Sequence, residues 1–184
     1  MKNIRLGAPQ SNWSFKIKAI RVLWMSVAFI YWPIFPKSFS FVRVFVARLF
    51  GAKIGKHCLI CPGVKIWMPW NLHLDDYVSI GHNVEIYNFA KISIGSHTSI
   101  SQNVFLCTAS HDYTDPVHPL IYKNIRIEGQ CWLAAGAFVG PGVHISEGAV
   151  VGAMSVVAKN VKSWSVNAGN PAVFIKKREV GGGD

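Results

Sequence analysis

An aliphatic residue recurs at every sixth position along most of this chain, and this period restricts the fold more than any other feature. A period of six matches neither an α-helix nor an isolated amphipathic strand. It is typical of a parallel β-helix, in which each hexad supplies one short strand and one corner. The fifteen members of the series are all Ile, Leu or Val: Ile54, Ile60, Ile66, Leu74, Ile80, Ile86, Ile94, Ile100, Leu106, Ile127, Leu133, Val139, Ile145, Val151 and Val157.

Three hexads make one triangular coil, and stacked coils bury their aliphatic positions against one another. The series predicts five coils, at residues 54–71, 74–91, 94–111, 127–144 and 145–162. Extra residues fall only after the third hexad of a coil, at 72–73, 92–93 and 112–126, so we expect all three insertions at one corner of the prism. Tight turns that need positive φ are expected at Gly63, Asn83, Asn103, Gly136, Gly142 and Gly148.

This register divides the chain into three parts. Residues 1–53 form a basic, Trp-rich helical segment, residues 54–162 form the β-helix with a protruding loop at 112–126, and residues 163–184 form a closing segment and tail. His111 is predicted to be the last residue of the third coil, on its rigid edge. The residues that follow it belong to the loop, among them Asp112, Asp115, Pro116, His118 and Pro119.

The formal net charge of +10 belongs entirely to the N-terminal segment. Residues 1–56 contain ten Lys or Arg and no Asp or Glu, whereas residues 57–184 contain nine of each kind and sum to zero. This asymmetry does not fit a uniformly basic nucleic-acid-binding protein, so no nucleic-acid partner is expected. The chain is 51% hydrophobic, which excludes a disordered protein.

The basic segment also contains an uncharged run, "VLWMSVAFIYWPIFP", from Val22 to Pro36. It is shorter than the roughly 20 residues that cross a bilayer, and Pro33 and Pro36 interrupt its end. We expect two short helices, the second ended by Gly51. Either they pack on the domain or on a neighbouring subunit, or residues 13–50 make a peripheral contact with an anionic membrane.

The four cysteines, Cys58, Cys61, Cys107 and Cys131, include one C-x-x-C without a second pair at zinc-ribbon spacing. Metal binding is therefore not expected, and the cysteines are predicted to be free thiols in a reducing compartment. No secretory signal is recognisable. The expected location is the cytoplasm, or the inner face of the cytoplasmic membrane under the membrane interpretation.

Several motifs resemble those of known proteins. "IGSHTS", "VGPGVH", "VGAMSV" and the closing "AGNPA" resemble the hexapeptide-repeat acyltransferases. "RLFGAKIGK", "CTASHD", "CWLAAGAFVGPGV" and "GNPAVFIKKR" are similar to the O-acetyltransferases of colanic acid and related exopolysaccharide pathways, over roughly residues 12–178. The expected fold is all-β, a left-handed parallel β-helix. The left hand is implied only by the resemblance, because ordinary crossovers between parallel strands are right-handed.

The resemblance implies an acetyl-CoA-dependent O-acetyltransferase that acts on a sugar hydroxyl of a surface-polysaccharide precursor. In such proteins the histidine at the start of the protruding loop is the general base, and "SHD" places this role on His111. Histidine suits the role because its pKa lies near neutrality. Asp112, His118 and His144 are candidates to orient the imidazole or to contact the acceptor. Cys107, near His111 in sequence, is a weaker candidate for a covalent nucleophile.

For coenzyme A the resemblance aligns Trp132, Ala135, Ala153, Ala158 and Lys159 with the pantetheine groove and its phosphate end. Ala135 and Ala158 depart from the family, which often has hydroxyl residues there. Lys176, Lys177 and Arg178 are further candidates for the nucleotide phosphates. Similar proteins are homotrimers with sites between adjacent prisms, and the acceptor is a sugar or a lipid-linked oligosaccharide.

Two other functions fit the same fold. A zinc hydratase of the γ-carbonic-anhydrase type needs two histidines five residues apart, but the gaps between histidines here are 16, 9, 15, 14, 7 and 26. A non-catalytic trimeric scaffold at the membrane would use the prism only for subunit contacts. His111 and the closing motif favour the acetyltransferase over both.

Overall fold

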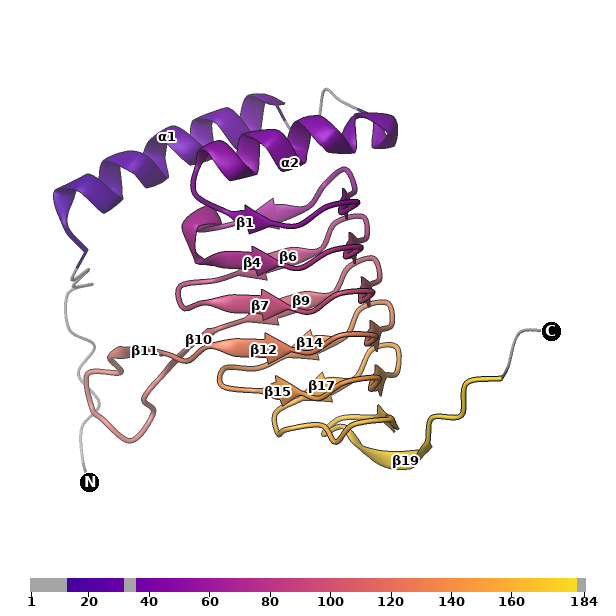
Figure 1. Ribbon diagram of the computed structural model, residues 1–184. Helices are drawn as coiled ribbons and strands as arrows, with labels where there is room; N and C mark the ends of the chain where they lie inside the picture. Colours follow the sequence, from indigo (N-terminus) through magenta and orange to yellow (C-terminus); the bar gives the residue numbers. More distant parts are fainter. Residues whose placement is uncertain (1–12, 32–35, 182–184) are drawn as a thin grey trace.

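Short parallel strands stack into a triangular prism in the computed structural model, which describes residues 13–31 and 36–181 (Figure 1). Face A contains β1 (Lys53–Ile54), β4 (Leu72–Leu74), β7 (Ile92–Ile94), β12 (Ile125–Ile127) and β15 (His144–Ile145). Face B contains β2 (Leu59–Ile60), β5 (Ser79–Ile80), β8 (Ser99–Ile100), β13 (Trp132–Leu133), β16 (Val150–Val151), β18 (Ser165–Ala168) and β19 (Val173–Lys177). Face C contains β3 (Lys65–Ile66), β6 (Glu85–Tyr87), β9 (Phe105–Cys107), β14 (Phe138–Val139) and β17 (Val156–Val157).

The prism is the left-handed β-helix that the repeat and the resemblance predicted. As the chain descends from the helices in Figure 1, the strands of face A point right in front and those of face C point left behind them. A partial sixth turn begins at the end of the fifth predicted coil, where Val161 bridges to Ile145, and β18 then joins face B.

The aliphatic series fills the interior of the prism, and all fifteen side chains are buried. The strand register stacks equivalent hexads, as in Ile54 beside Leu74 and Leu74 beside Ile94. Burial of these side chains from water supplies the main driving force of the fold. The six predicted turn residues all have positive φ. At Gly148, where φ is +68°, a Cβ atom would also lie only 2.6 Å from the Trp164 ring, so only glycine fits.

Two helices lie across the N-terminal end of the prism, α1 (Phe15–Tyr31) and α2 (Ser40–Leu49), joined to a short 3-10 helix η1 (Lys37–Phe39) (Figure 1). At 17 residues α1 is longer than the short helix expected, because it begins before the uncharged run. Gly51 follows α2 with φ +91°, as predicted. Within the described ranges no helix is long and apolar enough to cross a membrane.

Side chains from these helices bind the free backbone edge of the first coil. Trp24 Nε1–H donates to the Ile66 carbonyl at 2.6 Å, and Arg48 Nη2 donates to the Ile54 carbonyl at 2.7 Å. On the remaining face, Arg43 Nη1 donates to the Ile60 carbonyl at 3.5 Å. Each face of the prism therefore has its first carbonyl bonded by one helix side chain. Two of these side chains are the arginines Arg43 and Arg48, whose positive charge lies against the prism.

The opposite end of the prism is closed by the antiparallel pair β18–β19. The pairing contains a register shift between Val166 and Asn167, which marks a bulge. The last strand carries Lys176 and Lys177, and all five of its residues are exposed. A 3-10 helix, η2 (Pro69–Asn71), occupies the first corner between faces C and A.

Candidate active site

The segment around His111 leaves the prism as a β-hairpin. β10 (Ala109–His111) pairs antiparallel with β11 (Leu120–Tyr122), and His111 lies opposite Leu120. The prediction that His111 ends the third coil on its rigid edge is therefore wrong. The excursion begins at Ala109, because antiparallel pairing with the returning strand satisfies this backbone instead of the ladder of face C.

Thr108 fixes the base of this hairpin, a role that the sequence analysis did not identify. Its buried hydroxyl donates to the Tyr87 carbonyl at 2.9 Å and accepts from the Ala90 N–H at 3.0 Å. Its carbonyl accepts from the Lys123 N–H at 2.9 Å, on the returning strand. A single threonine thus ties both strands of the hairpin to the corner of the preceding coil.

We expect Thr108→Val to destabilise the protein by about 1–3 kcal/mol, because valine fills the same space but leaves the Ala90 N–H without its acceptor, while the Tyr87 carbonyl keeps only the Thr108 N–H. Chemical denaturation at a fixed protein concentration measures this change. Thr108→Ser keeps the hydroxyl and is the matched control. Equal stability of the valine variant and the wild type would contradict the assigned role.

The imidazole of His111 is exposed on the hairpin and held by one backbone contact. Its Nδ1 lies 2.6 Å from the carbonyl oxygen of His118. Because a carbonyl only accepts, Nδ1 must carry the hydrogen of the neutral ring. The neutral ring therefore has its lone pair on Nε2, which is the form that a general base requires.

Asp112 and His118 occupy the loop beyond His111. The Asp112 carboxylate accepts from the hydroxyl of Thr114 at 2.6 Å and from its N–H at 2.9 Å, and these two bonds hold the pKa of Asp112 below its ordinary value. These contacts with Thr114 hold the carboxylate in a turn instead of beside the His111 ring. His118 has φ +47° and meets the ring through its carbonyl oxygen, not through its side chain.

The Cys107 thiol is poorly suited to nucleophilic attack. It is buried at the end of β9, where its Sγ lies 3.1 Å from the Ala109 carbonyl. Burial raises the pKa of this thiol above its ordinary value, so the reactive thiolate is disfavoured. A mechanism without a covalent enzyme intermediate fits this environment better.

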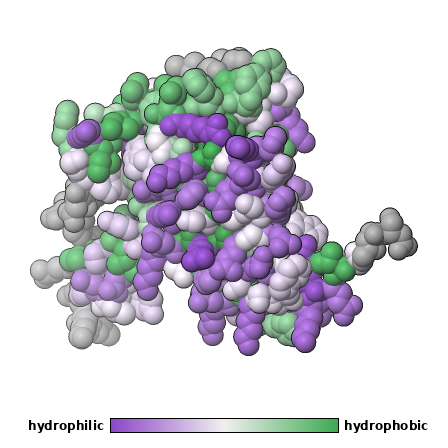
Figure 2. Space-filling model, viewed as in Figure 1, coloured by the Kyte–Doolittle hydropathy of each residue, from purple (hydrophilic) through white to green (hydrophobic). Residues whose placement is uncertain are grey.

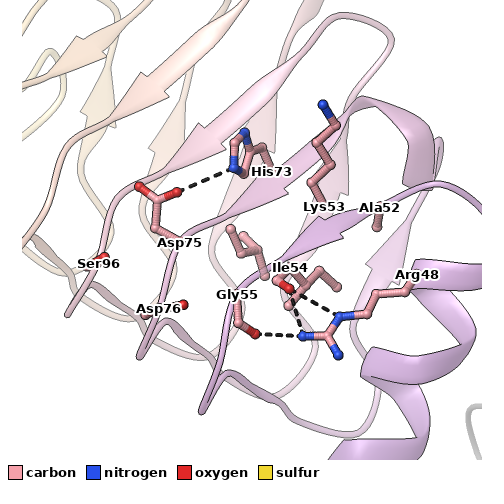
Figure 3. A pocket seen from close by; sticks show the side chains of 10 residues that line it. Arg48, Ala52, Lys53, Ile54, Gly55, His73, Asp75, Asp76 and Ser96 are labelled. Carbon is pink, nitrogen blue, oxygen red and sulfur yellow. Dashed lines mark hydrogen bonds and ion pairs between the residues drawn. The ribbon is translucent and has the colours of Figure 1, made fainter.

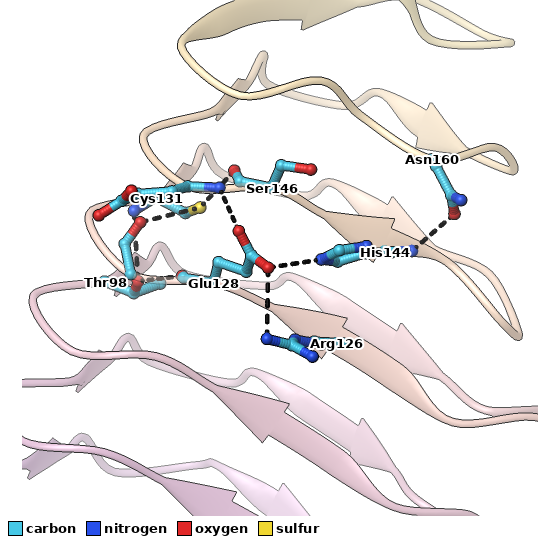
Figure 4. A network of polar contacts seen from close by, with 9 residues as sticks. Thr98, Arg126, Glu128, Cys131, His144, Ser146 and Asn160 are labelled. Atoms are coloured by element: carbon cyan, nitrogen blue, oxygen red, sulfur yellow. Dashed lines mark hydrogen bonds and ion pairs between the residues drawn. The ribbon is translucent and has the colours of Figure 1, made fainter.

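His144 belongs to a polar network on face A, shown in Figure 4. Its Nε2 lies 2.9 Å from Oε1 of Glu128, and Arg126 lies 3.4 Å from the same oxygen. The Glu147 N–H and the His144 ring together hold the pKa of Glu128 below its ordinary value. His144 starts β15, and the Glu128 carboxylate holds its ring. It is therefore not stacked against His111.

The residues aligned with coenzyme A lie on face B and on the two edges of the prism that flank face C. Trp132, 47% exposed on face B, donates from Nε1 to the Ser101 hydroxyl at 3.0 Å. Ala135 and Ala153 occupy successive turns of the corner between faces B and C, where the Met154 N–H donates to the Ala135 carbonyl. Ala158 and Lys159 follow β17 at the corner between faces C and A, the corner from which the hairpin also leaves.

Lys176 lies on β19, opposite Val166 of face B. Within one chain the six candidates are therefore split between face B and these two edges. His111 shares the edge of Ala158 and Lys159 but belongs to an earlier coil.

Two shallow cavities of about 500 Å³ each lie along face A, and none of the predicted site residues lines them. Figure 3 shows the first, where His73 faces Asp75 at 3.4 Å and Arg48 turns inward to the Ile54 and Gly55 carbonyls. In the part of the chain that the structure describes, no group of three or more His, Cys, Asp or Glu is arranged to hold a metal ion.

Comparison with known proteins extends over nearly the whole chain. No protein-family model matches the sequence. The chain is 45% identical over 161 residues to the putative colanic acid biosynthesis acetyltransferase WcaF of Escherichia coli K12, which covers 87% of this chain and 88% of that protein.

Two solved structures share the fold. A hexapeptide-repeat-containing acetyltransferase of Vibrio cholerae, complexed with acetyl coenzyme A, superimposes with a TM-score of 0.81 at 24% identity over 91% of each chain. A maltose O-acetyltransferase of Clostridium difficile has a TM-score of 0.79 at 21% identity, over 91% of this chain and 90% of that one. This chain belongs to the family of hexapeptide-repeat acetyltransferases that includes WcaF.

Proposed function

We propose that this protein transfers an acetyl group from acetyl-CoA to a hydroxyl of a sugar in a surface-polysaccharide precursor, with His111 as general base. The observation that carries the proposal is the contact between His111 Nδ1 and the His118 carbonyl, which leaves the Nε2 lone pair on an exposed ring. The similarity to an enzyme of colanic acid biosynthesis supports a sugar acceptor.

The reaction is a direct attack. His111 Nε2 removes the proton of the sugar hydroxyl as the oxygen forms its bond to the thioester carbonyl carbon. The tetrahedral intermediate collapses by breaking the carbon–sulfur bond, and the proton passes to the departing coenzyme A thiolate. The His118 carbonyl stabilises the imidazolium that forms between these steps, because it accepts the Nδ1 hydrogen throughout.

Coenzyme A is proposed to lie along the coils that follow the hairpin. Trp132, Ala135 and Ala153 are the candidates for the pantetheine groove, and Ala158, Lys159 and Lys176 for its ends. The short side chain of alanine leaves backbone N–H and C=O groups at these corners accessible to a ligand. An acetyl-CoA complex of a protein with this fold supports the choice of donor.

The active protein is proposed to be a homotrimer in the cytoplasm. The candidate residues lie on face B and on both edges of face C of one prism, so we propose that a complete site combines residues from two adjacent copies. Beside the outward Lys65 and Glu85 of its first two strands, face C carries a row of aromatic side chains that supports such packing. Aromatic rings follow one another along it, with centroid distances of 4.8 Å for Trp67–Tyr87, 6.1 Å for Tyr87–Phe105 and 5.5 Å for Phe105–Phe138.

Mass spectrometry of nucleotide-linked and lipid-linked oligosaccharides tests the proposal after incubation with acetyl-CoA and the full-length protein. We expect one oligosaccharide class to gain the mass of an acetyl group, with release of free coenzyme A in equal amount. The His111→Ala protein is the control for adventitious transfer. Coenzyme A release without any acetylated sugar would overturn the acceptor class, and no turnover at all would overturn the enzymatic assignment.

A further inference from the structure

The outer surface of the two N-terminal helices is apolar, and its side chains are exposed in the part of the chain that the structure describes. One side of each helix packs on the prism, through Trp24 of α1 and through Val44 and Ala47 of α2. The opposite side is green in the space-filling view of Figure 2, at the top of the molecule. This outer cap surface consists of Phe15, Val22, Leu23, Met25, Phe39, Phe41, Phe45 and Leu49, all exposed.

Lysines border the outer cap surface, and no carboxylate lies within it. Lys16 and Lys18 are exposed on α1 and Lys37 is exposed on η1. The sequence has no Asp or Glu before Asp75. Arg43 and Arg48 point into the prism, so the lysines supply the positive charge on this side of the described helices.

An apolar surface bordered by cations has the chemistry of an interfacial helix on an anionic bilayer. The apolar side chains enter the boundary between headgroups and acyl chains, while the lysines reach the lipid phosphates. A second copy that docked through the same surface would place lysines against lysines, which disfavours self-association there. A membrane is therefore the better occupant.

We propose that the outer cap surface docks on an anionic lipid bilayer with the prism axis along the membrane normal. Both helices lie across the end of the prism, so a bilayer parallel to them is perpendicular to its axis (Figure 1). The hairpin leaves at the third coil, two strand spacings or about 10 Å from the first. Adding a helix layer of about 10 Å places His111 roughly 20 Å from the lipid.

This arrangement narrows the acceptor, and in this respect it rests on the proposed function. A water-soluble nucleotide sugar gains nothing from an enzyme held at a bilayer. A sugar chain attached to a lipid is confined to the same surface, so its local concentration near His111 rises. The structure thus favours the lipid-linked acceptor over the nucleotide-linked one.

Vesicle flotation tests the docking without any need for catalysis. The full-length protein is mixed with vesicles of phosphatidylglycerol and phosphatidylcholine, or of phosphatidylcholine alone. We expect flotation with the anionic vesicles, weakened by high salt. Replacing Phe41 and Phe45 with serine should lower partitioning into the vesicles about 10- to 100-fold. The free energy gained by moving two phenyl rings from water into the bilayer is then lost. Val173→Ser with Phe174→Ser is the matched control, since Phe174 is 58% exposed and Phe45 59%.

Each outcome of the flotation experiment has a defined meaning. Loss of flotation in the cap variant but not in the control supports the docking. Failure of the wild type to float, or equal flotation of all variants, would overturn it. A change in the mass of the cap variant in light scattering, without flotation of the wild type, would identify the surface as a protein contact. An unchanged urea unfolding midpoint shows that the cap variant is folded, and keeps this result separate from the test of the reaction.

Discussion

Replacing His111 with alanine is expected to lower kcat by about 10²- to 10⁴-fold. The variant keeps the corner, the hairpin pairing and the candidate coenzyme A residues, because His111 is exposed and only its ring is removed. The sugar hydroxyl then attacks without a base to accept its proton. Steady-state coenzyme A release measures kcat, and isothermal titration of coenzyme A shows that donor binding is unchanged.

His118→Ala is the matched control for this loss. His118 meets the catalytic ring through its backbone carbonyl, which the substitution keeps. We therefore expect kcat to stay within a few-fold of the wild type, with any larger effect confined to the KM of the acceptor. A His111→Ala enzyme with nearly normal turnover, or an equal loss of kcat in both variants, would refute the assignment of the base.

Replacing Trp24 with alanine is expected to destabilise the protein by about 3–5 kcal/mol. The indole is 1% exposed and packs on the first coil, where its N–H also bonds the Ile66 carbonyl. The substitution opens a cavity beneath α1 and leaves that carbonyl without the indole donor. Urea denaturation at matched protein concentrations gives the change in the free energy of unfolding.

Leu23→Ala removes a neighbouring side chain from the same helix and serves as the control. Leu23 is 58% exposed on the outer cap surface, so its loss should cost less than about 0.5 kcal/mol. Similar destabilisation by the two substitutions would mean that α1 does not pack as described.

The repeat region could be read from the sequence because its physical cause is local. A six-residue period places one aliphatic side chain inside each strand, and all fifteen are indeed buried. The turn residues were equally predictable, since positive φ favours Gly and Asn at those positions.

The first residues of the hairpin were mispredicted because their hexad pattern continues into it. The hexad that begins at Leu106 extends through Ser110 to His111, yet Ser110 is exposed and pairs with Ile121. The choice between coil and hairpin depends on a partner strand eleven residues away, and no local pattern encodes that pairing. The contact of His111 with the His118 carbonyl was hidden for a similar reason, because a backbone acceptor has no sequence signature.

The N-terminal segment was only half understood from its composition. Its composition left open whether it packs on the domain or contacts a membrane, and the structure turns Trp24, Arg43 and Arg48 toward the first coil. The side of a helix that packs on the prism depends on the positions of the free strand edges of the first coil. The sequence does not show these positions. The apolar outer side was exposed all the same, so the segment both packs and leaves a surface for the proposed docking.

A stack of identical coils has no intrinsic length, and an open end would accept a coil from another molecule as readily as one of its own. Here one end has its carbonyls bonded by side chains, and the other finishes in a bulged strand that carries lysines. Growth into fibres is blocked in both directions along the axis. The flanks of the prism, where the hairpin and the candidate donor residues lie, remain for the contact between copies that we propose.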